Sequence, residues 1–518
     1  MSRHLLVPAL LLSLVACATV PQSTLSEVTR PSARFKILQI NDVYKIEGLE
    51  SGKTGGLARV RTLRKHLESD GTPVLVLHGG DVIYPSVMSK YLEARPMIDV
   101  MNLLDGDPAK EDLGLVVTFG NHEFDDKDAG ILLARLNDSA FQWVSTNVRW
   151  CNPDCNQLFP NQSDIFQVEL EGVKVAMFGL TYPLRKPYVQ ATDPITAARE
   201  AVEPLLLEGA DVIIAITHQE MSDDVKLLQQ VPAIDLVIGG HDHLYMARQV
   251  NGEWITKADA DAKSAIVYDI TVSPDGEVRT TPLRVALDET IPKDPEVDAR
   301  VQMWLGELSA KLGGNVTLAT TENLLEGVEP VIRGRESALG NLLTDIAREQ
   351  MQTDVAVLAG GSVRINDNIV PGPITTYDME GIFYYTSTLV AFPVTGQQLL
   401  DMLRNSVSHA DDAAGRFLQV SGISFTYHPR GSSFVVDAED VKVAGKPLDL
   451  NATYTVASID YLYTNGPEDG YTLFADATRP PKVNESREAD FRKTVEAWLR
   501  AKGTVDTEIE GRIVRAQG

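Results

Sequence analysis

The sequence predicts an α/β protein with two domains. From residue 35 onward, short apolar segments alternate with amphipathic, helix-like segments, which is the pattern of an α/β fold. The chain has 518 residues, more than one hydrophobic core normally serves, so two domains are expected. An amphipathic helix is expected at residues 294–312, and a second α/β pattern follows from about residue 316.

The first domain is expected to contain a series of short buried strands. A hairpin is indicated where residues 166–170 and 173–178 flank Glu171-Gly172. Asp193-Pro194 is typical of a helix start, so a helix is expected from there to about residue 207. The other apolar runs predict strands at residues 35–40, 74–77, 115–119, 212–216 and 236–238.

Each of those five strands is followed by polar residues that can bind a metal. Open α/β sheets bind ligands at the carboxyl ends of their strands, so the five ends are expected to form one site if the strands are neighbours. Any one of these residues alone is more often a capping aspartate or a satisfied histidine. Four of the nine histidines nevertheless lie at such ends. The candidate ligands are Asp42, Asp81, Asn121, His218, His241 and His243.

The composition limits the classes of partner. With 47 basic and 72 acidic residues the formal charge is -25, which argues against binding nucleic acid or anionic lipid through charge. Small phosphorylated substrates remain compatible, because metal ions and a few arginines can reverse the local field.

The N-terminus predicts export. Arg3 and His4 precede an apolar run at residues 5–15, which is the length of a signal h-region and too short to span a bilayer. The run ends in Leu14-Val15-Ala16-Cys17, which resembles the bacterial lipobox, and ordinary signal cleavage is the alternative. The expected location is the periplasm or cell envelope, as an outer-membrane lipoprotein that touches the membrane only through its lipid anchor. No oligomeric state is indicated.

The two remaining cysteines, Cys151 and Cys155, are expected to form a short disulfide loop in an exported protein. Two free thiols are the alternative, because the loop is short. The pair has too few neighbouring ligands for a zinc site.

The order of the motifs N-D-x-x, G-G-D, G-N-H-E, T-H and G-G-H-x-H resembles the calcineurin-like metallophosphoesterases. The spelling of residues 120–125, GNHEFD, is similar to the 5'-nucleotidase branch of that family. The resemblance implies an N-terminal layered sandwich of mixed sheets flanked by helices, plus a second α/β substrate-binding domain. The implied divisions are a signal peptide with lipobox (1–17), a tether (18–33), a metallophosphoesterase domain (34–290), a linker helix (291–315) and a 5'-nucleotidase C-terminal domain (316–518).

The resemblance also implies a role for each motif residue. Two divalent metal ions, Mn, Zn or Fe, would bind the phosphate and activate a water. Asp81 would bridge them, and His122, oriented by Asp125, would be the catalytic imidazole. Asp42 and His243 would hold one metal, and Asn121, His218 and His241 the other.

The first motif departs from the family pattern, because Asp42-Val43-Tyr44 stands where Asp-x-His is usual. Three alternatives follow. In the first, Tyr44 ligates as a phenolate, which would favour ferric iron. In the second, it points away and a water takes its place. In the third, the first metal binds weakly and activity is slow or lost. Retained binding, with Tyr44 among the ligands, is the expectation.

The second half resembles the 5'-nucleotidase C-terminal domain, through residues 333–336, 340–345, 359–364, 415–422 and 460–471. Arginine offers a planar fork of donors that suits phosphate. Arg333 and Arg364 would contact the substrate across a domain cleft. Phe417 and Tyr461 would sandwich the nucleobase, with Asp469 and Asn341 as polar partners.

Two departures bear on the substrate. Ala359 replaces a usual Asn, and Gly466-Pro467-Glu468-Asp469-Gly470 replaces a compact G-G-D-G. The expected activity is metal-dependent hydrolysis of nucleotide phosphate esters. The alternatives are 2',3'-cyclic nucleotides, nucleotide sugars, a sulfur-linked or non-nucleotide substrate, and a binding lipoprotein that has lost catalysis.

Overall fold

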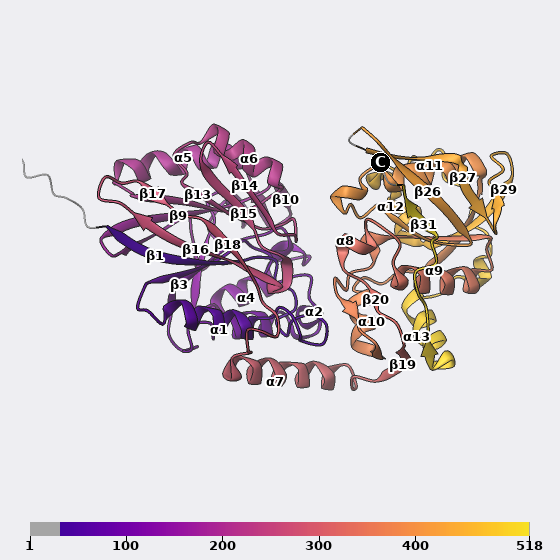
Figure 1. Ribbon diagram of the computed structural model, residues 1–518, viewed down its shortest axis with the longest axis horizontal. Helices are drawn as coiled ribbons and strands as arrows, with labels where there is room; N and C mark the ends of the chain where they lie inside the picture. Colours follow the sequence, from indigo (N-terminus) through magenta and orange to yellow (C-terminus); the bar gives the residue numbers. More distant parts are fainter. Residues whose placement is uncertain (1–31, 432, 517–518) are drawn as a thin grey trace, which may run out of the picture.

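The structure, a computed structural model, describes residues 32–431 and 433–516. Two lobes lie side by side and are joined through helix α7 (Pro295–Lys311), which runs along the bottom of the view in Figure 1. The expected lipobox at Cys17 and most of the tether lie outside the described residues. Within the described ranges, no helix is long and apolar enough to cross a membrane.

The first lobe is built on two large sheets. The first sheet has the order β17 (Val278–Arg279), β16 (Ser264–Val272), β1 (Ala33–Ile40), β2 (Val74–His78), β3 (Asp112–Thr118), β4 (Phe141–Val144) and β7 (Gln162–Ser163), with β18 (Pro282–Ala286) also paired to β16. The second has the order β14 (Met246–Val250), β15 (Glu253–Lys257), β13 (Leu236–Gly239), β12 (Val212–His218), β9 (Val173–Thr181) and β8 (Ile165–Leu170). All five predicted strands and the hairpin are therefore confirmed.

The two sheets pack face to face and are covered outside by helices. Phe35, Leu75 and Val116 of the first sheet share one buried cluster with Ile214 and Ile238 of the second. Helices α1 (Leu57–Glu68), α2 (Val87–Leu92), α3 (Arg95–Met101) and α4 (Gly130–Asp138) belong to the cluster beyond the first sheet. Helices α5 (Pro194–Leu207) and α6 (Met221–Gln230) belong to the cluster beyond the second. The expected layered sandwich of mixed sheets is confirmed.

Helix α7 belongs structurally to the first lobe. Val297, Val301 and Trp304 are buried in the cluster that α1 and α3 also line. The Trp304 indole donates to Asp99 Oδ2 at 2.7 Å. The predicted domain limits stay predictions, although α7 lies where the sequence predicts a linker helix.

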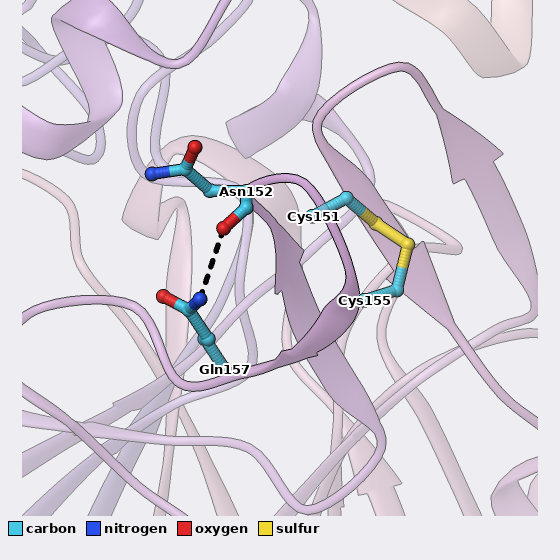
Figure 2. The surroundings of a disulfide bond; sticks show 4 residues. All are labelled: Cys151, Asn152, Cys155 and Gln157. Atoms are coloured by element: carbon cyan, nitrogen blue, oxygen red, sulfur yellow. Dashed lines mark hydrogen bonds between the residues drawn. A yellow bond between two sulfur atoms is a disulfide. The ribbon is translucent and has the colours of Figure 1, made fainter.

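The cysteine pair forms a disulfide, as predicted. Cys151 ends β5 (Val148–Cys151) and Cys155 begins β6 (Cys155–Gln157), and the two sulfurs are bonded across this hairpin (Figure 2). The Gln157 amide donates to Asn152 O at 2.9 Å inside the same turn (Figure 2). With β10 (Leu184–Lys186) and β11 (Val189–Ala191), these strands form a small sheet.

The second lobe is centred on a four-stranded sheet, in the order β24 (Leu389–Thr395), β29 (Thr453–Ile459), β21 (Val355–Ala359) and β25 (Leu418–Ser421). Val355 and Val357 face one buried cluster and Ala356 and Leu358 the other, as strand periodicity requires. The helices are α8 (Glu329–Ile332), α9 (Ala338–Met351), α10 (Thr376–Ile382), α11 (Gly396–Val407), α12 (Asp460–Asn465) and α13 (Phe491–Lys502). Smaller sheets comprise β28 (Lys446–Pro447), β27 (Ser433–Val443), β26 (Ile423–Arg430) and β31 (Ile513–Arg515); β23 (Gly372–Thr375), β19 (Thr317–Thr321) and β30 (Thr504–Val505); and β20 (Leu325–Glu326) with β22 (Asn368–Ile369).

Polar contacts join the two lobes. Lys45 pairs with Asp367 Oδ2 at 2.9 Å, and the Glu50 amide donates to Asp367 Oδ1 at 2.9 Å. The Tyr377 hydroxyl donates to Glu47. The lobes therefore meet in a closed arrangement in which charged and hydrogen-bonded groups cross the boundary.

Candidate active site

The polar residues that follow the five strands come together, although the strands belong to two different sheets. β1, β2 and β3 lie in the first sheet, and β12 and β13 in the second. Their ends meet closely enough that a Cβ on Gly240 would lie 2.3 Å from Gly79 O. The His218 imidazole of the second sheet donates through Nδ1 to the same Gly79 carbonyl at 2.7 Å. Glycine at position 240 is thus required by the close approach of the two strand ends.

Four of the candidate ligands have left-handed backbone conformations. Asp42, Asp81, His241 and His243 have φ values of 52°, 60°, 83° and 59°. Such values are uncommon outside glycine and cost free energy, so they persist where the surrounding structure holds them, often at functional sites.

The centre contains two buried carboxylates and an imidazole. Asp42 and Asp81 are 0% and 1% exposed. One ligand atom from each of Asp42, Asp81 and His218 can be chosen so that all lie within 4.8 Å of one another. His218 Nε2 is 3.2 Å from Asp81 Oδ2 and 3.2 Å from the Asn121 amide oxygen.

Charge interactions dominate the ionisation of this centre. Burial lowers the pKa of His218, but Asp81 and Asp42 overcome it and raise that pKa to about 9. Burial raises the pKa of Asp81, and the opposing charges of His218 and His122 bring it down to about 2. Two carboxylates this deeply buried need a positive partner, which the neighbouring imidazoles supply in this structure.

Tyr44 points into the centre. Its hydroxyl lies 2.8 Å from Asp81 Oδ2, 3.2 Å from Asp42 Oδ1 and 3.1 Å from His243 Nε2. Burial and the two aspartates raise the pKa of Tyr44 well above its usual value. The alternative in which Tyr44 points away and leaves its place to water is therefore wrong.

His243 and His241 approach the centre differently. His243 Nε2 faces Asp42 Oδ1 at 3.4 Å, and its Nδ1 lies 2.8 Å from Glu329 Oε2 of the second lobe. His241 contributes its backbone amide, which donates to Asp42 Oδ2 at 2.9 Å. The His241 ring packs 5.1 Å from the His218 ring, and its Nε2 is 3.5 Å from Glu220.

His122 stands at the open side of the centre. Its backbone amide donates to Asp81 Oδ1 at 2.8 Å, and its Nδ1 lies 2.6 Å from Asp125 Oδ2, the predicted orienting contact. Lys186 binds the other oxygen of Asp125 at 3.3 Å. Although burial lowers the pKa of His122, Asp81 and Asp125 raise it above its usual value. Nε2 is thus the ring nitrogen left free of these contacts.

A cleft of about 450 Å³ lies between the lobes at this centre. Asp81, His122 and His241 line one side, and Arg333 and Arg364 line the other. Arg333 pairs with Glu329 through one terminal nitrogen. The Nε atoms of both arginines are buried without a hydrogen-bond partner among the described residues. An anion in the cleft would meet these two guanidinium groups.

The other predicted substrate residues divide into two groups. The Tyr461 ring, on α12, is 44% exposed and available for stacking, and Asp469 is partly buried nearby. Phe417 is 0% exposed, packed in the core beside Tyr427, so its predicted base-stacking role is wrong in this arrangement. The predicted role of Asn341 is also wrong, because its buried amide donates to Glu336 Oε1 at 2.7 Å and to Glu508 O at 3.0 Å.

Three residues that shape the centre are not among those predicted from the sequence. The fully buried Glu123 carboxylate accepts from the amides of Asp81 at 3.1 Å, Val82 at 2.5 Å and Gly120. Glu123 belongs to the GNHE motif, so its position in that motif was the available signal. Lys257 is 0% exposed and pairs with Asp224 at 3.2 Å and with Asp242, which fixes the loop between His241 and His243. Glu329 is a third, and it carries no local sequence signal.

Comparison with known families assigns both halves of the chain. The family model for calcineurin-like phosphoesterases matches residues 35–245, and that for the 5'-nucleotidase C-terminal domain matches residues 317–476.

Known proteins are similar to this chain over most of its length. Protein UshA of Yersinia enterocolitica is 27% identical over 83% of this chain and 84% of its own. The trifunctional nucleotide phosphoesterase protein YfkN of Bacillus subtilis is 26% identical over 88% of this chain, which spans only 34% of YfkN. The crystal structure of a 5'-nucleotidase precursor from Thermus thermophilus is 26% identical, with a TM-score of 0.74 over 94% of this chain and 100% of that one.

Proposed function

Because the chain belongs to the family that joins a calcineurin-like phosphoesterase domain to a 5'-nucleotidase C-terminal domain, we propose that it hydrolyses phosphate esters of nucleotides. One observation carries the proposal. A single cleft of about 450 Å³ presents Asp81 and His122 of one lobe opposite Arg333 and Arg364 of the other. A phosphoryl group in this cleft would contact the cationic side chains and the candidate metal centre together.

The donor set fits two divalent metal ions. Asp42, Asp81 and His218 offer carboxylate and imidazole ligand atoms within 4.8 Å of one another, and such atoms are suitable ligands for Mn, Zn or Fe. Asp81 would be shared between the ions. Such ions supply Lewis acidity to the phosphoryl oxygens and lower the pKa of water. Asp42, Tyr44 and His243 would hold one ion, and Asn121, His218 and His241 the other.

Tyr44 is proposed as an oxygen ligand in place of the usual histidine. Its hydroxyl lies between Asp42, Asp81 and His243, on the side of the centre assigned to the first ion. A phenolate oxygen would favour a more highly charged ion, and ferric iron is the natural candidate. Because the metal-free phenol holds its proton firmly, metal binding there would release a proton.

The remaining chemistry belongs to the chain's own side chains. Arg333 and Arg364 would bind the non-reacting phosphate oxygens, using the Nε atoms that have no protein partner among the described residues. His122 Nε2 would give its proton to the leaving oxygen, and Asp125 would hold the ring in orientation through Nδ1. Closure of the lobes would exclude water from the cleft.

Tyr461 is the proposed platform for the nucleobase. Its ring is 44% exposed, and stacking on an aromatic ring stabilises a bound base by about 1–3 kcal/mol with little preference among bases. With Phe417 buried and Ala359 in place of an amide, the base would be held on one face, so broad base tolerance is expected. Cyclic 2',3'-phosphates and nucleotide sugars fit the same framework.

We infer that the protein acts outside the cytoplasm. The Cys151–Cys155 disulfide supports this, because disulfides persist in oxidising compartments. Outer-membrane lipidation at Cys17 is part of the same proposal.

The test is phosphate release by the chain from Ser23 onward, stripped of metal and reloaded with Mn, Zn or Fe. The substrates are nucleoside monophosphates, cyclic nucleotides and nucleotide sugars. Metal-dependent release that collapses in His122→Ala supports the proposal, and the preferred substrate names the class. If the wild type releases no phosphate with any metal or substrate, and Tyr44→His does, the protein is a binding protein that has lost catalysis.

A further inference from the structure

One ligand of the candidate metal centre is held from the opposite lobe. Glu329 begins α8 in the second lobe, and its Oε2 lies 2.8 Å from His243 Nδ1 of the first lobe. Glu329 is only 7% exposed. Its other oxygen pairs with Arg333, and its backbone amide donates to the Asn366 side chain at 3.1 Å. Arg333 therefore holds one oxygen of the carboxylate, and the Asn366 contact holds the backbone of Glu329, while the other oxygen meets the imidazole.

This contact determines which ring nitrogen of His243 faces the centre. A carboxylate accepts hydrogen bonds, so the proton of the Glu329–His243 contact lies on Nδ1. Nε2 is then the atom that faces Asp42 Oδ1 at 3.4 Å and the Tyr44 hydroxyl at 3.1 Å. Carboxylates that bind the outer nitrogen of a metal-ligating histidine fix the ring orientation and raise its basicity.

We propose that Glu329 is the positioning residue of His243, so that the metal centre in the first lobe is completed by the second lobe. The inference rests on the proposed metal centre but not on hydrolysis. Opening of the lobes separates Glu329 from His243, so metal affinity is higher in the closed arrangement. By reciprocity, a bound metal stabilises the closed arrangement to the same extent.

The experiment is a Mn²⁺ titration of the full chain, with free Mn²⁺ followed by electron paramagnetic resonance. Glu329→Ala is expected to lower the affinity of the weaker-binding Mn²⁺ by about 10–100-fold, the usual effect of removing such a partner. Glu329→Gln is expected to lose less, because its amide oxygen still accepts from Nδ1. The matched control is Arg335→Gln, which removes an exposed arginine of the same segment that pairs with Glu326 at 3.4 Å, and it should leave the Mn²⁺ affinity unchanged.

Several results of the Mn²⁺ titration would contradict the proposed role of Glu329. Equal Mn²⁺ affinity in the wild type and Glu329→Ala would overturn the inference, as would an equal loss in Arg335→Gln, or absence of stoichiometric Mn²⁺ binding in the wild type. Circular dichroism checks that each variant is folded. If Glu329→Ala is not folded, Glu329→Gln, which keeps the side-chain volume, serves as the test. If Mn²⁺ binding weakens in Glu329→Ala but the wild type releases no phosphate from any substrate, this inference is supported and the proposed function is wrong.

Discussion

At the scale of single residues, the His122 imidazole has the surroundings of a general acid. Its Nδ1 is held by Asp125 at 2.6 Å, and its ring lies in the cleft that Arg364 also lines. We predict that His122→Ala lowers kcat by about 10²–10⁴-fold, the range for a lost general acid or base. Steady-state kinetics with a nucleoside monophosphate measure this. Asp125→Asn should lose less, and an unchanged kcat in His122→Ala would assign the proton transfer elsewhere.

Tyr44 allows a spectroscopic prediction. If its oxygen ligates, the ferric protein should be coloured, with a visible charge-transfer band from the phenolate to iron. Tyr44→Phe should abolish the band and reduce the iron bound per chain toward half, since Asp42 and His243 lose the oxygen that lies between them. Absorption spectroscopy with iron analysis checks this. A band that survives in Tyr44→Phe would exclude Tyr44 as the source.

The sequence motifs predicted correctly which metal-ligand candidates lie close together. They did not predict which motif side chains are buried. Asp42, Asp81 and His218 follow strands, so their meeting could be expected from strand order. Phe417 and Asn341 also belong to matching motifs, but both side chains are 0% exposed. A motif fixes the identity of a residue and not its burial, which depends on how the neighbouring elements pack.

At the scale of elements, α7 depends on its N-cap. The Asp294 side chain accepts from the amides of Glu296 at 3.1 Å and Val297 at 3.2 Å, and also pairs with Lys65. We predict that Asp294→Ala lowers the free energy of unfolding of the first lobe by about 1–2 kcal/mol. Urea denaturation followed by circular dichroism measures it. Lys65→Ala, which removes only the half-exposed ion-pair partner, should cost less than about 1 kcal/mol. Equal losses would show that the ion pair matters and the cap does not.

The start of β13 gives a pH dependence. Burial raises the pKa of Asp235 to about 6, opposed by a hydrogen bond from the Ile213 amide. When the pKa of an acid is higher in the folded protein than in the unfolded chain, the acid stabilises the fold fully at pH values below its unfolded pKa of about 3.9. This stabilisation is lost as the pH rises through the folded pKa. Asp235→Asn should therefore match the wild type near pH 4 and exceed it by about 2–3 kcal/mol above pH 7, because each pKa unit of the shift is worth about 1.4 kcal/mol. Unfolding free energies from pH 4 to 8 test this, and a constant difference would contradict it.

Elements were predictable from the sequence because each has a local signature. The Asp193 cap of α5 and the strand ends at β1, β2 and β12 depend on neighbours within a few residues. Glu329 and Lys257 act on loops distant in sequence, through contacts that only the assembled sheets and lobes create. The hydrophobic pattern of the strands also does not indicate that the five strands are divided between two facing sheets.

At the scale of the whole molecule, function depends on how the lobes meet. The arginines of the second lobe line the same cleft as Asp81 and His122 of the first, and Glu329 adds a contact to the candidate metal ligand His243 across the boundary. The contacts of Asp367, Tyr377 and Glu329 across the boundary are ion pairs and hydrogen bonds, which exchange readily with water. Such an interface permits rotation between an open and a closed arrangement.

Asp367 makes two polar contacts across that boundary. Its carboxylate accepts from Lys45 Nζ and from the Glu50 amide, both at 2.9 Å. We predict that Asp367→Ala shifts the ratio of open to closed molecules by about five- to tenfold, equivalent to ~1–1.4 kcal/mol. Small-angle X-ray scattering should then give a larger radius of gyration than the wild type. Asp269→Ala, which removes an aspartate paired with Arg34 inside the first lobe, is the matched control and should leave the radius unchanged. If both variants keep the wild-type radius, the closed arrangement does not depend on Asp367, and the remaining contacts suffice to hold the lobes together.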